Sequence, residues 1–133
     1  MIAAVADTHA TIWYLFGDSR LSSRAKNFID EAATQGQQIG ISSITLAEMV
    51  YLQERGRIQP TALARIFDAF DRTDSILAEV PFDRRIVQAL TRVPRLEVPD
   101  LPDRIIAATA LQLDVPLISR DQKIRLSSVE TIW

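Results

Sequence analysis

The opening stretch, I-A-A-V-A-D-T-H over residues 2–9, constrains the fold of this chain most strongly. Its five small or β-branched apolar residues in succession are typical of a central strand of a parallel sheet, which is buried on both faces. Asp7 follows this run directly. In open α/β sheets ligands bind outside the carboxyl ends of the strands, so Asp7 is the first candidate site residue.

Apolar runs, helix starts and helix stops alternate along the rest of the chain. We expect helices over residues 10–16, 22–34, 44–55, 60–73, 83–93 and 102–113, and further strands over 38–42, 75–80, 116–119 and 129–133. Strands that alternate with helices predict parallel pairing through right-handed crossovers. We therefore predict an α/β fold, in one domain over residues 1–133, with a parallel sheet of four or five strands and helices on both faces.

Composition narrows the kinds of site that the chain can build. It has no cysteine, which excludes disulfide scaffolds, thiolate zinc sites and cysteine nucleophiles. Its single histidine also excludes a His-rich metal site. The net charge of -2 does not forbid a nucleic-acid binder, because acids that hold cations mask basic residues in the sum. The opening segment lacks the basic stretch of a secretion signal, and no apolar run reaches the roughly 20 residues of a membrane helix. We expect a cytoplasmic protein without membrane contact.

Four acids stand at positions where chemistry is expected in such a sheet. They follow predicted strands or begin predicted helices, and they are Asp7, Glu48, Asp103 and Asp121. Strand ends and the helix starts that follow them share one edge of a parallel sheet, so acids far apart in sequence can meet in one cleft. The pattern predicts an acidic cleft.

Each acid also has a purely structural explanation. Acids are favoured near helix N-termini, which would explain Asp103 and Asp121. Thr45 and Glu48 match the capping-box pattern, in which the glutamate folds back onto a backbone N–H. Against this, Glu48 has apolar neighbours three and four residues away, and so does Asp103, which directs both carboxylates inward. Converging carboxylates need a cation, and oxygen ligands without Cys or His suit Mg²⁺ or Mn²⁺.

Four segments, in this order and spread over nearly the whole chain, resemble the PIN domain family. They are D-T-H after the first strand, S-S-I-T-L-A-E, P-D-L-P-D-R-I-I-A-A-T-A and L-I-S-R-D. The length and the D-T-H and D-R-I-I-A-A-T-A forms resemble, more narrowly, the VapC-type toxins of bacterial and archaeal toxin-antitoxin pairs. The resemblance implies a three-layer α/β/α domain that acts as a metal-dependent endoribonuclease on RNA. It also implies an antitoxin partner and a homodimer.

The same resemblance implies roles for individual residues. Asp7, Glu48, Asp103 and Asp121 become the acids that hold Mg²⁺ or Mn²⁺. Thr8 and Ser119 become supporting hydroxyls, with Ser119 standing where the family often has threonine. Asp100 matches an acid common in this subgroup, and we expect it to cap the following helix or to support the ligands.

Three further side chains are candidates for contact with substrate. Histidine is the commonest general base, but His9 stands beside Thr8 and could point away from Asp7, so RNA contact or helix capping is the alternative. Arg104 and Arg120 stand next to Asp103 and Asp121 and could bind phosphates; the alternatives are ion pairs with neighbouring acids or exposure to solvent.

Two other functions remain open on the sequence. A PIN-like fold could bind RNA or protein without cleaving it. A strand that ends in Asp-Thr also suggests an Asp-nucleophile phosphatase, although the usual D-x-D-x-T form would require an acid where His9 stands.

Overall fold

The computed structural model describes all residues 1–133 and places five strands in one sheet. The strands are β1 (Ile2–Ala6), β2 (Gln38–Ser42), β3 (Leu77–Val80), β4 (Leu117–Ile118) and β5 (Thr131–Ile132), in the order β3-β2-β1-β4-β5. Every pairing is parallel, and Val5 of β1 is aligned with Gly40 of β2 and with Leu117 of β4. The predicted parallel α/β sheet is confirmed, with five strands.

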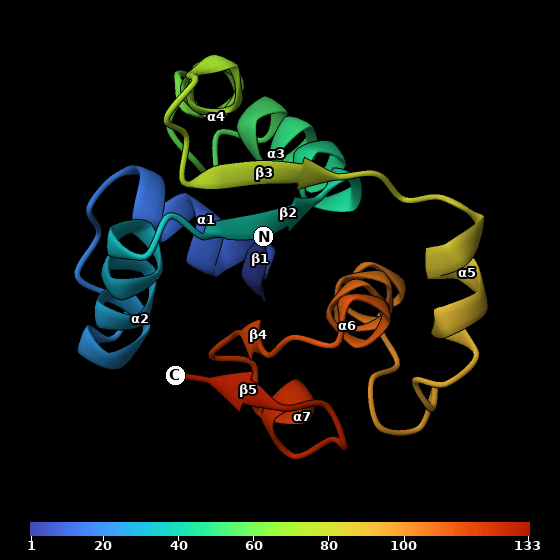
Figure 1. Cartoon of the computed structure of the whole chain (residues 1–133). Coiled ribbons are helices and arrows are strands. Elements are labelled where there is room, and N and C mark those ends of the chain that lie inside the picture. Colours follow the sequence, from blue (N-terminus) through green and yellow to red (C-terminus); the bar gives the residue numbers. More distant parts are fainter.

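Helices cover both faces of this sheet (Figure 1). One core contains residues of α1 (Thr8–Leu15), α2 (Ser23–Thr34), α3 (Ser43–Glu54) and α4 (Ala62–Asp71). The other contains residues of α5 (Arg84–Leu90), α6 (Leu101–Leu113) and α7 (Gln122–Arg125). No helix combines the length and the apolar character that a bilayer crossing requires.

The period of two along each strand explains why both cores form. In β1, Ala4 and Ala6 belong to the core with α1 to α4, whereas Val5 belongs to the core with α5 to α7. In β4, Ile118 belongs to the core with α1 to α4, and Leu117 belongs to the core with α5 to α7. A strand that is apolar at every position therefore contributes to both layers, as predicted for the opening stretch.

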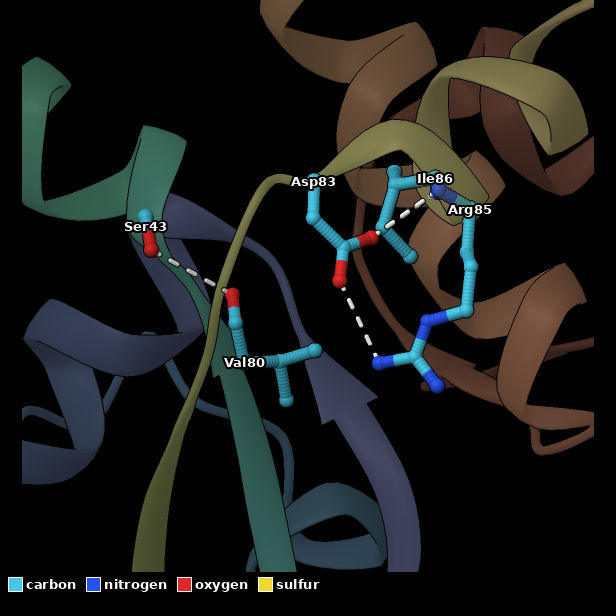
Figure 2. Close-up of polar contacts among 5 residues, drawn as sticks. All are labelled: Ser43, Val80, Asp83, Arg85 and Ile86. Atoms are coloured by element: carbon cyan, nitrogen blue, oxygen red, sulfur yellow. Dashed lines mark hydrogen bonds and ion pairs between the residues drawn. The ribbon is translucent and has the colours of Figure 1, made fainter.

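Polar side chains fix where the helices begin. The Ser22 hydroxyl accepts a hydrogen bond from the backbone N–H of Ala25 at 3.1 Å, which starts α2. Asp83 starts α5 by accepting from the backbone N–H groups of Arg85 and Ile86 at 3.0 and 3.4 Å. Figure 2 shows the bond from Ile86 and the ion pair between Asp83 and the Arg85 guanidinium. Figure 2 also shows Ser43, whose hydroxyl donates to the Val80 carbonyl at 3.4 Å and ties the start of α3 to the end of β3.

Several predicted boundaries are wrong, each for a local reason. Helix α1 begins at Thr8 rather than at residue 10, because Asp7 caps it. Helix α5 ends at Leu90 rather than at residue 93, because the chain then tightens into i to i−3 turns. Helix α4 begins at Ala62 rather than at residue 60, because the chain first forms a turn in which the Ala62 N–H donates to the Gln59 carbonyl at 3.1 Å. Helix α7 was not predicted, because four residues are too few to show a helical period.

Candidate active site

The order of the strands creates a crevice between β1 and β4. From β1 the chain continues outward through β2 to β3 on one side, whereas β4 and β5 extend the sheet on the other. This reversal is the topological switch point at which open α/β sheets bind ligands. Asp7 follows β1, and its backbone N–H donates to the Ile118 carbonyl of β4 at 3.1 Å. Ser119 follows β4 directly, and Asp121 stands two residues further on, just before α7.

A cleft of about 650 Å³ opens at this edge. It brings together eight of the ten side chains singled out in the sequence, namely Asp7, Thr8, His9, Glu48, Asp100, Asp103, Arg120 and Asp121. Trp13, Gln122 and Lys123 also line it and were not predicted as site residues. Gln122 and Lys123 stand just after Asp121, which could have identified them as site residues. Nothing in the sequence distinguished Trp13 from a core residue. The predicted convergence of the acids is seen in the structure.

Asp7 forms the buried floor of the cleft, with 8% of its surface exposed. Its Oδ1 accepts a hydrogen bond from the backbone N–H of Ala10 at 2.9 Å, which fixes the carboxylate at the start of α1. Burial raises the pKa of Asp7, and the nearby Ser119 hydroxyl only partly opposes this. The Asp7 carboxylate is therefore fixed in position, but its surroundings stabilise its negative charge only weakly.

Glu48 is held from α1. The Thr8 hydroxyl donates to Glu48 Oε1 at 2.5 Å and lies 3.2 Å from the Thr45 hydroxyl. The capping-box alternative is wrong, because α3 is capped by Ser42, which accepts from the Ile44 backbone N–H, and Thr45 is buried within the helix. Burial raises the pKa of Glu48, which means that its surroundings make the ionised carboxylate less stable than it would be in water.

Asp103 has a strongly perturbed carboxyl group. Burial is the first cause, and the negative charges of Asp100, Asp121, Glu48 and Asp7 add to it, which together raise the pKa of Asp103 to about 7. No arginine or lysine pairs with these acids: the ion pairs of the chain are Arg20–Asp18, Lys26–Asp30 and Arg85–Asp83, all elsewhere. The cleft thus concentrates negative charge that no ion pair neutralises.

Asp121 and Asp100 both cap helices at the cleft. Asp121 Oδ1 accepts from the backbone N–H groups of Lys123 and Ile124 at 2.8 and 3.2 Å, and the Asp121 N–H donates to Ser119 Oγ at 3.0 Å. Asp100 Oδ2 accepts from the Asp103 N–H at 3.1 Å and starts α6. The structural explanation of an acid near a helix start is therefore correct for Asp121, and the capping role expected of Asp100 is seen as well. Both residues nevertheless line the cleft.

The donor set fits a hydrated divalent cation. No three of the carboxylates lie close enough to ligate one ion directly. Mg²⁺, however, keeps several of its waters and takes one or two protein carboxylates together with phosphate oxygens of a substrate. An all-oxygen, uncompensated acidic cleft has the chemistry that Mg²⁺ or Mn²⁺ requires, with room for water and phosphate to complete the shell.

Arg104 does not line the cleft, which corrects its prediction as a phosphate ligand. Its Nε donates to the Val93 carbonyl at 3.1 Å, and its Nη2 donates to the carbonyls of Leu90 and Val93 at 3.1 and 2.8 Å. These carbonyls terminate α5 and the turn after it. The guanidinium therefore fastens α6 to the end of α5, a contact between distant segments that no local pattern revealed.

Replacing Arg104 with alanine should lower the free energy of unfolding by about 2–3 kcal/mol, since two carbonyls lose a charged donor. Urea denaturation measures this loss. Arg24→Ala, at an exposed position in α2, is the matched control and should leave stability within about 0.5 kcal/mol. An Arg104→Ala protein as stable as the wild type would contradict this structural role.

His9 lies at the mouth of the cleft. Its side chain is exposed, and its ring is 5.7 Å from the Trp13 ring between centroids, tilted by 39°. It makes no hydrogen bond to any of the acids. This placement gives no support to a general-base role for His9 and is compatible with contact to a ligand that enters the cleft.

Comparison with known proteins places this chain in a family. Residues 4–129 match the family described as the PIN domain. The chain is 23% identical over 125 residues to Ribonuclease VapC22 of Mycobacterium tuberculosis (strain ATCC 25618 / H37Rv), covering 94% of this chain and 92% of that protein.

Solved structures agree with this assignment. The VapBC2 complex from Rickettsia felis, bound to a DNA fragment from its promoter, has a chain that aligns with a TM-score of 0.71 at 18% identity, covering 98% of this chain and 97% of that one. A toxin-antitoxin complex from Klebsiella pneumoniae aligns with a TM-score of 0.55 at 26% identity, over 92% and 90% of the two chains. Because the family match spans nearly the whole chain, the protein belongs to the PIN domain family.

Proposed function

We propose that this protein is a Mg²⁺- or Mn²⁺-dependent endoribonuclease. The observation that carries the proposal is the cleft in which Asp7, Glu48, Asp103 and Asp121 meet without an ion-pair partner, so that burial and then mutual repulsion raise the pKa of Asp103 to about 7. Such a cluster destabilises the folded protein unless a cation neutralises it. Acids that form a site despite this loss of stability favour a metal-dependent function over a purely structural one.

In the proposed site, each residue has a distinct task. The carboxylates of Asp7, Glu48, Asp103 and Asp121 hold the cations. Bound there, divalent ions supply activation of water and stabilisation of the leaving oxygen in phosphodiester hydrolysis. Thr8 orients the Glu48 carboxylate through its hydroxyl, Ser119 orients the Asp121 backbone, and Asp100 fixes the start of α6 beneath Asp103.

RNA as the substrate is supported by the relative Ribonuclease VapC22, whose length matches that of this chain. The proposed partner is a cognate antitoxin protein, because the similar solved structures from Rickettsia felis and Klebsiella pneumoniae are toxin-antitoxin complexes. We also propose a homodimer in the cytoplasm. A small DNA-binding protein encoded next to this chain, and a dimeric mass by light scattering, are the expected observations.

Removal of divalent metal should abolish RNA cleavage. The purified protein is expected to cleave single-stranded RNA in Mg²⁺ or Mn²⁺ and to stop in EDTA, since the uncompensated acids would then repel the phosphate. Calorimetric titration with Mn²⁺ should show binding heat. Gel analysis of labelled RNA provides the cleavage measurement, with NaCl added to the EDTA sample as a control for ionic strength.

The other outcomes of this experiment identify the alternatives. RNA binding with no Mn²⁺ heat and no cleavage would favour a non-catalytic binding module. A covalent phosphate on Asp7, detected by mass spectrometry after incubation with a phosphate ester, would favour the Asp-nucleophile phosphatase.

A further inference from the structure

One edge of the acidic cleft carries cationic and aromatic side chains. Arg120 and Lys123 come from the segment around the start of α7, and His9 and Trp13 come from α1. Neither Arg120 nor Lys123 forms an ion pair or a side-chain hydrogen bond within the protein. The cleft is therefore polarised, with acids at its floor and unpaired cations at this edge.

Arg120 is held in place by an indole. Its guanidinium carbon lies 4.6 Å from the centroid of the Trp13 ring, over the ring. Trp13 is only 4% exposed and packs with a centroid distance of 5.8 Å on Trp133, so the platform is rigid. A guanidinium stacked on an aromatic face keeps its in-plane N–H donors free, and these match two oxygens of a phosphate.

Two other arginines show how Arg120 differs. Arg20 lies 5.2 Å from the same Trp13 centroid, but its Nε and Nη2 donate to Asp18 at 3.1 and 2.8 Å, and it does not line the cleft. Arg104 uses its donors on backbone carbonyls. Of these three, Arg120 alone combines a contact with the Trp13 ring, free donors and a place at the cleft.

We propose that Arg120, oriented by Trp13, binds a backbone phosphate of single-stranded RNA at the edge of the acidic cleft, and that Trp13 is a positioning residue. The inference rests on the proposed ribonuclease function and adds the direction from which the strand enters. A phosphate that approaches five carboxylates is repelled, so one pre-oriented cation beside them sets where the backbone can lie.

The test measures KM and kcat on a fluorophore-quencher oligoribonucleotide of mixed sequence in Mg²⁺. Arg120→Gln should raise KM about 10-fold, as for the loss of a charged hydrogen bond, with a smaller change in kcat. The slope of log KM against log salt should fall by about 0.7, since one phosphate contact is lost. Trp13→Leu should raise KM similarly, and should add nothing in the Arg120→Gln background. Trp13→Phe keeps an aromatic face and should retain most of the wild-type KM.

A fluorescence measurement distinguishes the loss of the RNA contact at Arg120 from unfolding of the protein. The chain has two tryptophans, so Trp133→Phe leaves Trp13 as the sole reporter. Its emission should change when the oligoribonucleotide is added, and this change should disappear with Arg120→Gln. Arg20→Gln, which removes the other arginine over the same ring, is the matched control and should leave KM and the salt slope unchanged.

The possible failures are distinguishable. If the wild type cleaves RNA and Arg120→Gln leaves KM and salt slope unchanged, this inference is wrong and the proposed function stands. If Trp13→Leu still raises KM in the Arg120→Gln background, Trp13 does not act through Arg120. If the wild type neither binds nor cleaves the oligoribonucleotide with any divalent metal, both proposals are overturned.

Discussion

Replacing Asp103 with asparagine is expected to abolish RNA cleavage and, at pH 7, to make the metal-free protein more stable. The carboxyl group of Asp103 has a pKa of about 7 in the folded protein, against an ordinary value of 3.8. The folded state therefore binds this proton more tightly than the unfolded state, and stability falls as pH rises from about 4 to about 7. Asparagine removes the charge that causes this loss.

The expected gain at pH 7 is about 1–2 kcal/mol, because solvent at the half-buried carboxyl screens much of the interaction. Urea denaturation in EDTA at several pH values between 4 and 7 measures it. The wild type should lose stability across this range, and Asp103→Asn should lose less. Glu31→Gln, an exposed site in α2 outside the cleft, should leave both stability and cleavage unchanged.

A stabilised but inactive Asp103→Asn protein would show that the cleft retains its charge for function. Conversely, a variant that cleaves RNA normally would remove Asp103 from the metal-binding set. A variant that is less stable than the wild type at pH 7 would show that its carboxylate is compensated in solution, contrary to the crowding seen around it.

Features set by short stretches of sequence were predicted best. The opening apolar run is a strand buried on both faces, and α2 begins next to its Ser22 cap, at the start of the predicted helix. The meeting of Asp7, Glu48, Asp103 and Asp121 in one cleft also followed, because parallel strands place all their carboxyl ends at one edge.

Features that depend on distant partners were missed or misassigned. Glu48 matched a capping box in sequence, yet Thr8 of another helix takes its carboxylate. Arg104 stands beside a site acid, yet its donors reach back to carbonyls at the end of α5. Arg120 and Trp13 are far apart in the chain, so their stacking appears only when β4 brings the segments together. Local patterns hold no information on such pairs.

Replacing Asp7 with asparagine should lower the rate of RNA cleavage by more than 100-fold without unfolding the protein. An asparagine side chain caps a helix about as well as aspartate, so its amide oxygen can still accept from the Ala10 N–H. Only the buried charge at the cleft floor is lost. Loss of residues that merely support metal ligands costs 10–100-fold, and removal of a ligand should cost more. Cleavage kinetics and Mn²⁺ calorimetry give the two measurements.

Asp83 offers a matched control for this substitution. It caps α5 through two backbone N–H groups, as Figure 2 shows in part, but it does not line the cleft. If capping were the whole role of Asp7, then Asp7→Asn and Asp83→Asn would both leave cleavage at the wild-type rate. If Asp7 holds a cation, only Asp7→Asn loses cleavage and Mn²⁺ heat. The two variants thus distinguish the capping role of Asp7 from the role of its charge, because asparagine keeps the helix cap and removes the negative charge at both sites.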